Sequence, residues 1–189
     1  MAQRRVESSV IDEDAYLRVE DTASIRHEYV DGRMYALAGA SDAHNQIVTN
    51  IVAAVRPQIR GTDSRIYAND MRLRISSRLY YYPDLMVACD PTDNASMIRE
   101  RPCALVEVLS PSTGTIDQRE KVLAYKQIPS LKAYLIVYQG DRFVEFHSRI
   151  DGDIWQIVDL NGSGEIVIPC ADITLTFDEI YEDVPIGTS

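Results

Sequence analysis

Apolar side chains recur at three- and four-residue intervals between residues 43 and 56, which predicts an amphipathic helix with one face toward a core. The stripe contains Ile47, Ile51, Ala54 and Val55. Ser41 or Asp42 suits the N-cap, because either side chain can accept a hydrogen bond from a backbone N–H of the first turn. His44 lies three residues before Ile47, so we expect it on the inward side, as a structural hydrogen-bonding group or as a catalytic one.

Two further helices are predicted from their capping patterns. Residues 12–20 begin with acidic side chains in the first turn, where the helix dipole favours negative charge. Asp117 and Glu120 form a capping-box-like pair at the start of a helix that ends near Ile128, because a proline follows. One stripe of this helix contains Asp117, Lys121, Tyr125 and Ile128.

Alternating or continuous apolar runs predict the strands. They cover residues 65–75, 82–89, 103–109 and 131–138. The 103–109 segment is apolar on both faces, so it belongs at the centre of a sheet. Asp31-Gly32 between two aromatic-rich segments predicts a tight hairpin, and later turn signals mark three more strands or hairpins up to Ile168.

The order of elements predicts an α/β (α+β) fold with a central mixed β-sheet, flanking helices and extra C-terminal β-hairpins. At 189 residues and 46% hydrophobic composition, the chain suits a single domain over 1–189. No apolar run reaches the roughly 20 residues of a membrane span, and the polar start lacks a secretory signal. We therefore expect a cytoplasmic protein with no membrane partner, and a homodimer formed through paired sheet edges.

The formal net charge of −10 argues against a protein that coats nucleic acid non-specifically, because such binding depends on neutralising phosphates. The charge is uneven, however. The segment from Arg56 to Arg78 contains six arginines and only two acidic residues. This segment is either an ordinary solvated surface or a surface that contacts phosphates.

The three cysteines are Cys89, Cys103 and Cys170. They are widely spaced and form no CxxC pair, and two of them lie in apolar strands. We expect buried free thiols, with neither a disulfide framework nor a zinc site.

Two carboxylates on neighbouring predicted strands carry the candidate chemistry. Asp84 begins the strand 82–89, and Glu107 lies within the apolar strand 103–109, where an uncompensated charge is costly. Facing carboxylates raise one another's pKa unless a divalent cation lies between them, and oxygen ligands suit Mg²⁺ or Mn²⁺. Such an ion activates water for attack on a phosphodiester. The alternative is a turn acid and a buried carboxylate that is hydrogen-bonded to the backbone.

Three segments resemble the Uma2 family of restriction endonuclease-like proteins. They read HEYVDGRMYALAGASDAHN, YYYPDLMVACD and EVLSPSTGTIDQREKVLAYKQIPSLKAYLIV. Pro83-Asp84 followed by Glu107 also resembles the PD-(D/E)xK nuclease signature. The resemblance extends over about residues 12–183.

The resemblance implies a restriction-endonuclease-like fold and Mg²⁺-dependent cleavage of nucleic acid, with DNA as the expected substrate. By the same resemblance Asp84 and Glu107 would be metal ligands, while Glu28 and His44 would line the same pocket. The chain departs from the signature at Leu109, where the strand lysine should stand. Lys121 on the following helix is the candidate replacement, although an ordinary surface lysine is the alternative.

Three readings of the chain remain. The preferred one is a metal-dependent endonuclease, and its rival is a catalytically inactive module that keeps the nuclease fold for binding or assembly. A glycosidase using the two carboxylates is the third, but nothing in the sequence specifies a sugar-binding groove. Tyr80, Tyr81 and Tyr82 either pack in the core or stack on bases.

Overall fold

A mixed six-stranded sheet forms the centre of the protein in this computed structural model, which describes residues 10–109 and 115–186. Its strands lie in the order β11-β10-β9-β8-β6-β3, with β8 and β9 parallel and the other pairs antiparallel. The strands are β3 (Arg65–Ala68), β6 (Leu85–Ala88), β8 (Pro102–Leu109), β9 (Ala133–Tyr138), β10 (Phe143–Asp151) and β11 (Ile154–Asn161).

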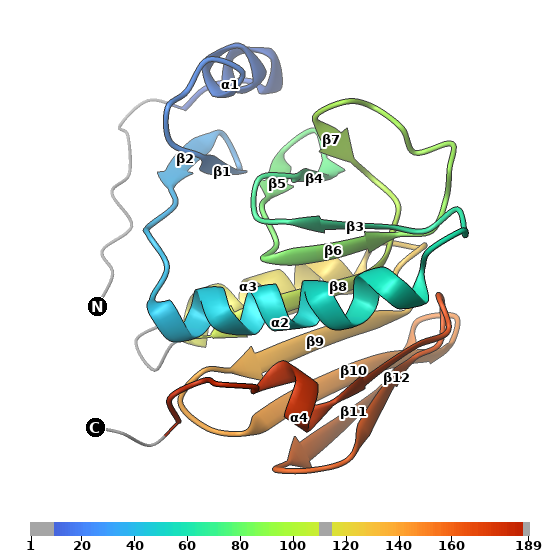
Figure 1. The fold of residues 1–189 in the computed structure, drawn as a ribbon. Helices are drawn as coiled ribbons and strands as arrows, with labels where there is room; N and C mark the ends of the chain where they lie inside the picture. Colours follow the sequence, from blue (N-terminus) through green and yellow to red (C-terminus); the bar gives the residue numbers. More distant parts are fainter. Residues whose placement is uncertain (1–9, 110–114, 187–189) are drawn as a thin grey trace.

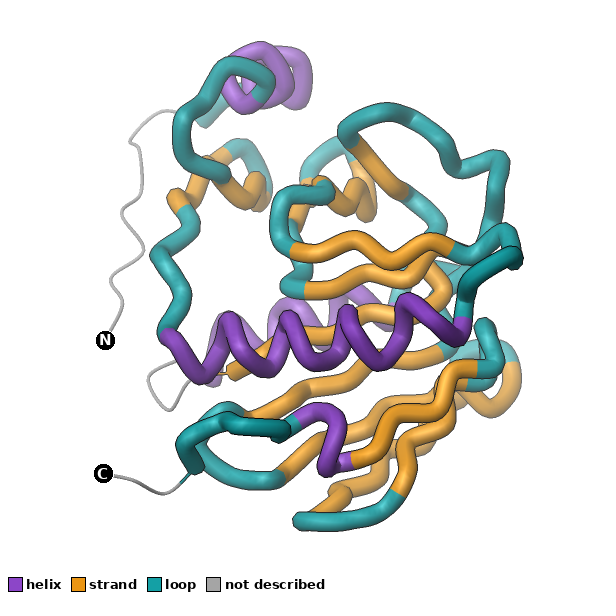
Figure 2. The backbone as a smooth tube through the Cα atoms, in the orientation of Figure 1, coloured by secondary structure: helices purple, strands orange, loops and turns teal. Residues whose placement is uncertain are grey.

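The two long helices cover opposite faces of this sheet (Figure 1). α2 (Asp42–Gln58) packs its apolar stripe on one face, together with the hairpin β12 (Glu165–Ile168)–β13 (Ile173–Thr176) and the short α4 (Phe177–Ile180). α3 (Thr115–Lys126) packs on the other face through Tyr125 and Ile128. Figure 2 shows the resulting helix–sheet–helix layering.

A second sheet of five strands lies beside the α3 face. Its order is β2-β1-β5-β4-β7, and its members are β1 (His27–Val30), β2 (Arg33–Ala36), β4 (Arg72–Ser76), β5 (Leu79–Tyr81) and β7 (Ile98–Arg99). α1 (Glu13–Glu20) packs on it through a cluster of buried tyrosines, which are Tyr16, Tyr29 and Tyr80.

Most of the expected elements are present at the expected places. Ser41 is the N-cap of α2 and accepts a hydrogen bond from the His44 N–H. The Asp31-Gly32 hairpin has both turn residues at positive φ, as the tight turn between β1 and β2 requires. β8 is fully buried and occupies an interior position in the sheet.

One predicted strand proved to be two. Residues 65–75 form β3 and β4, which belong to different sheets. The chain turns between them at Asn69, whose φ is 59°. The apolar alternation changes phase at this turn, from Ile66 and Ala68 to Met71, Leu73 and Ile75, with Asn69-Asp70 between them. The phase change and the polar pair were the sequence signal of the break.

Two helix boundaries differ from those expected. α2 continues through Pro57 to Gln58, because a proline in the last turn removes only one backbone donor and the N–H of Ile59 still reaches the Val55 carbonyl at 3.3 Å. α3 begins at Thr115, so Asp117 lies within the helix and not at its cap. The side chain of Asp117 lies outside the described residues.

The expectation of three free thiols is wrong. Cys89 and Cys103 form a disulfide, and Cys170 alone is free. Cys89 directly follows β6 and Cys103 is near the start of β8, so antiparallel pairing of these strands brings the two together. Within the described ranges, none of the helices combines the length and the apolar character that crossing a membrane would need.

Candidate active site

The pairing of β6 with β8 places the two predicted metal ligands opposite each other. Leu85 lies opposite Val106 and Met86 opposite Leu105 in this antiparallel pair. The same register puts Asp84, one residue before β6, across from Glu107. The two carboxylates are therefore neighbours at one end of two interior strands of the sheet, as the sequence predicted.

Each oxygen of Asp84 has its own partner. Oδ2 accepts a hydrogen bond from the backbone N–H of Val108 at 2.7 Å. Oδ1 lies 3.3 Å from Nε2 of His44, on the first turn of α2. The His44 and Asp84 side chains are 15% and 19% exposed, so both face a partly open space that solvent can enter.

Lys121, on α3, contacts the carboxylates of Glu28 and Glu107. Its Nζ lies 2.9 Å from Glu28 and 3.3 Å from both oxygens of Glu107. The Lys121 side chain is 12% exposed, so it is not a surface lysine. One turn further along α3, the Tyr125 hydroxyl donates to Glu107 at 2.7 Å.

Glu28 arrives from the second sheet. It is the second residue of β1, three positions before Asp31 of the tight turn, and its side chain is 3% exposed. Lys121 therefore joins three elements, since its amine contacts β1 and β8 from α3. The five residues predicted from the sequence form two contacting groups, His44–Asp84 and Glu28–Lys121–Glu107, which the pairing of β6 with β8 places side by side.

Burial sets the protonation of this cluster. Burial, together with the negative charges of Asp84 and Glu28, raises the pKa of Glu107 to about 7 against the lowering effects of Lys121 and Tyr125. Burial lowers the pKa of His44, but the hydrogen bond and charge of Asp84 outweigh it, so the pKa of His44 is raised overall. Near neutral pH the cluster can therefore both bind and release protons.

The comparisons with known proteins establish the family. A family model, Uma2, described as "Putative restriction endonuclease", matches residues 13–178. The chain belongs to the Uma2 family.

Two relatives from Synechocystis sp. span nearly the whole chain. "Uncharacterized protein slr1290" is 33% identical over 171 residues, which cover 89% of this chain and 90% of that protein. "Uncharacterized protein sll1609" is 32% identical over 169 residues, which cover 87% of this chain and 92% of that protein.

A solved structure shares the fold. It is a protein from Anabaena variabilis titled "a putative nuclease belonging to DUF820", with a TM-score of 0.72. At 15% identity, the match covers 90% of this chain and 97% of that chain. The expected nuclease-like fold, a mixed sheet with flanking helices, is thereby confirmed.

Three groups of the candidate site were not assigned to it from the sequence. They are the hydroxyl of Tyr125, the backbone N–H of Val108 and the ring of Tyr81, whose centroid lies 5.5 Å from the Lys121 amine. The inward stripe of α3 already included Tyr125, so that contact could have been found. The other two depend on strand register and on the second sheet.

The tyrosines at 80–82 pack in the interior. Their exposed fractions are 1%, 2% and 4%. Rings this deeply buried have no free face for a base, so the packing interpretation is confirmed.

The six arginines between Arg56 and Arg78 do not form one free cationic surface. Arg72 is buried against Tyr82 and Asp21. Arg74 pairs with Glu13 and Glu100, and Arg78 pairs with Asp31. Arg56 and Arg60 lie at the end of α2 opposite His44.

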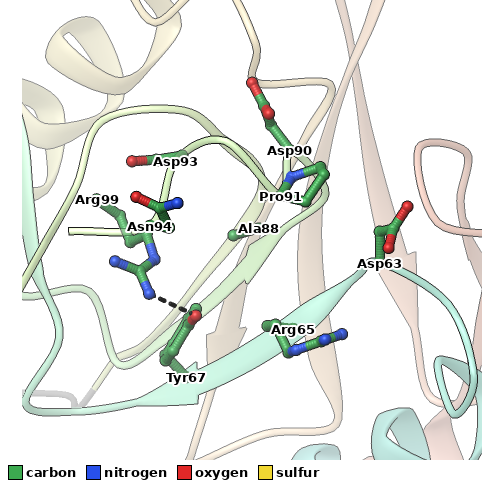
Figure 3. Close-up of a pocket in the computed structure, with 9 residues that line it drawn as sticks. All are labelled: Asp63, Arg65, Tyr67, Ala88, Asp90, Pro91, Asp93, Asn94 and Arg99. Atoms are coloured by element: carbon green, nitrogen blue, oxygen red, sulfur yellow. Dashed lines mark hydrogen bonds between the residues drawn. The ribbon is translucent and has the colours of Figure 1, made fainter. Parts of the chain in front are cut away.

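A separate polar recess of about 220 Å³ lies at the far end of β3 and β6 (Figure 3). Arg99 stacks over Tyr67 there, 4.7 Å from its centroid, and donates to its hydroxyl. The recess contains none of the five predicted site residues. Its acids Asp90 and Asp93 are engaged by neighbouring residues, so we assign the chemistry to the Lys121 cluster.

Proposed function

We propose that this Uma2 protein is a metal-dependent endonuclease that hydrolyses phosphodiester bonds in nucleic acid, with DNA as the preferred substrate. The contact of Lys121 with Glu107 carries the proposal. The strand position for the lysine of the PD-(D/E)xK signature is Leu109, and a lysine from α3 reaches the same carboxylate instead. Family membership and the shared nuclease-like fold support the same conclusion.

The donor set fits a hard divalent cation. Asp84 and Glu107 offer carboxylate oxygens from adjacent strands, which is the chemistry that Mg²⁺ and Mn²⁺ prefer, and so few protein ligands leave positions for water and phosphate. The bound ion would lower the pKa of a coordinated water and screen the charge that develops on the phosphate. Asp84 and Glu107 are the residues that would hold it.

The protein groups around this pair have separate tasks. Lys121 would donate to the attacking water or to a phosphate oxygen, while Glu28 keeps its amine in place at 2.9 Å. Val108 and His44 fix the two oxygens of Asp84, and Tyr125 fixes Glu107. Such preorganisation matters because misplacement by about 1 Å can cost 100-fold in rate.

Asp84→Asn tests the proposal with Asp159→Asn, on β11, as the matched control. Supercoiled plasmid, linear duplex, single-stranded DNA and RNA are incubated with Mg²⁺ or Mn²⁺, and with a chelator. We expect divalent-dependent cleavage of at least one substrate, lost in Asp84→Asn and retained in Asp159→Asn. Absence of cleavage with every substrate, or equal cleavage by both variants, would refute the endonuclease assignment.

A second candidate, an inactive binding or assembly module, is favoured by one observation. The carboxylates already have protein partners, because Lys121 and His44 supply compensating groups without a metal. In that case Glu107→Gln and Lys121→Met would lower stability, by about 3–5 kcal/mol for a broken buried pair, and leave Mg²⁺ binding unchanged. Calorimetric titration of Glu107→Gln with Mg²⁺ distinguishes the two candidates, because the endonuclease account expects this variant to lose the Mg²⁺ binding of the wild type.

A further inference from the structure

The three cysteines meet at the opposite end of β6 and β8 from the candidate active site. Their sulfur atoms all lie within 4.8 Å of one another. Cys89 follows β6, Cys103 opens β8, and Cys170 comes from the turn between β12 and β13. Cys89 lies five residues after Asp84, so at about 3.3 Å per residue the two sites are roughly 16 Å apart.

A β-bulge directs Cys103 toward this cluster. Val87 pairs with Ala104 and Ala88 with Pro102, so Cys103 is the extra residue on β8. Bulges redirect a side chain in this way. As a result Cys103 and Ala104 both pack into the α2-side core, where Cys89 and Cys170 also pack.

The Cys170 thiol is already oriented within the cluster. Its Sγ donates to the backbone carbonyl of Cys103 at 3.2 Å. Cys170 is not part of the disulfide, and yet its sulfur lies within 4.8 Å of the sulfurs of both Cys89 and Cys103. A disulfide alone gives no reason for a third sulfur at this position.

We propose that, in the reduced chain, Cys89, Cys103 and Cys170 bind one thiophilic cation, Zn²⁺, as a three-thiolate site. Zn–S bonds of about 2.3 Å in tetrahedral geometry place ligand sulfurs about 3.8 Å apart. The free thiol therefore moves by about 1 Å, and the sulfurs of Cys89 and Cys103 separate by about 2 Å once their bond is reduced. The fourth position takes water. Zinc binding and the disulfide exclude each other, because both use the sulfur atoms of Cys89 and Cys103.

The chemistry balances in two steps. A two-electron reductant, a dithiol or a phosphine, opens the Cys89–Cys103 bond with uptake of two protons, and the reductant is oxidised. Binding of Zn²⁺ then displaces one proton from each thiol to solvent, which leaves a complex of net charge −1 that the nearby Lys132 charge favours.

The sequence spacing gives no sign of this site. Zinc sites are recognised by pairs of ligands two to four residues apart, whereas these three come from separate segments. The bound ion would fasten the β12–β13 hairpin to the central sheet. This structural role is independent of whether the chain cleaves nucleic acid.

Cobalt titration of the full-length chain provides the test, because thiolate-to-cobalt charge-transfer absorption reports sulfur ligation and carboxylates do not give it. Protein reduced with a phosphine under argon is titrated with Co²⁺ and then with Zn²⁺. We expect an absorption that saturates at one Co²⁺ per chain, disappears on addition of Zn²⁺ and is absent from the oxidised protein. Zn²⁺ should also raise the melting temperature of the reduced chain.

Two variants complete the experiment. Cys170→Ser lies in a turn and keeps the other two thiols, while Ala171→Ser in the same turn is the matched control. We expect Co²⁺ affinity to fall at least tenfold in Cys170→Ser only. The proposal is overturned if the reduced wild type gives no charge-transfer absorption, if Cys170→Ser retains it undiminished, or if the disulfide can be reduced only by unfolding the chain.

Discussion

At the scale of single residues, substitution of Lys121 shows whether the carboxylate cluster is catalytic or only structural. Lys121→Met should reduce cleavage at least about 100-fold, the usual contribution of a positioned acid–base or charge-stabilising group. Mn²⁺ affinity should not fall, because the substitution removes a cation that contacts Glu107. Lys126→Met on the same helix is the control. Unchanged cleavage rates in Lys121→Met, measured on the preferred substrate, would remove Lys121 from the mechanism.

Glu107 makes metal binding pH-dependent. Its pKa is raised to about 7 by burial, so a proton must leave before the carboxylate can ligate, and Mn²⁺ affinity should increase as pH rises through 7. Calorimetry in buffers of different ionisation enthalpy should show proton release below pH 7. Glu107→Gln should abolish both the site and the release, and a pH-independent affinity in the wild type would contradict the account.

The same pKa affects stability without metal. An unfolded glutamate has a pKa of about 4.3, and the folded value is higher, so the folded state holds the extra proton between these values. The contribution of Glu107 is therefore complete below about pH 4 and is lost as pH rises toward 7. Relative to Glu107→Gln, the free energy of unfolding of the wild type should decrease over this range, as measured by urea titration.

The five site residues could be predicted because their signals are local or belong to the family pattern. Asp84 and Glu107 stand out as acids on apolar strands, and Lys121 lies on a stripe with Tyr125. The hydrogen bond from Val108 could not be predicted, because a backbone donor has no signature in the sequence. Their convergence is now an observed geometry, while their catalytic roles stay predictions.

At the scale of elements, the β1–β2 hairpin positions Glu28. Gly32 has a φ of +85°, and a Cβ there would lie 2.6 Å from Cγ1 of Val10 and 3.2 Å from the Ile11 carbonyl. Gly32→Ala should therefore destabilise the protein by more than the about 1–2 kcal/mol that a left-handed backbone costs, and it should lower cleavage.

Gly152→Ala is the matched control for this prediction. Its φ is also positive, at +48°, but nothing lies within 4 Å of the added Cβ. Chemical denaturation of the two variants should show the larger loss for Gly32→Ala. Equal losses would mean that the contacts of the hairpin with residues 10 and 11 contribute nothing.

Element prediction succeeded where the periodic pattern and the end signals coincide. α2 has both an apolar stripe and a capping serine, and β8 is apolar throughout. It failed at Asn69, where two alternating segments of different phase were predicted as one strand, and where long-range pairing decides, as for the Cys89–Cys103 disulfide. β13 and α4 follow the last predicted strand and were not anticipated.

At the scale of the whole molecule, the charge distribution limits binding to DNA. The net charge is −10, and several arginines of the 56–78 segment are paired with acids. We expect weak association with duplex DNA in a chelator, and stronger association with Ca²⁺, which can occupy an oxygen site. Fluorescence anisotropy should show this gain in the wild type and its loss in Asp84→Asn. Tight binding in the chelator, equal in both proteins, would contradict the prediction.

The central claim is that Asp84 and Glu107, on paired strands, share one divalent cation beside the Lys121 amine. Anomalous diffraction from a crystal soaked in Mn²⁺ tests it most directly. The account predicts an anomalous peak within about 2–2.5 Å of an oxygen from each carboxylate, and its absence from a crystal of Asp84→Asn. A wild-type crystal with no peak at these two side chains, soaked at a concentration that supports cleavage, would contradict the account.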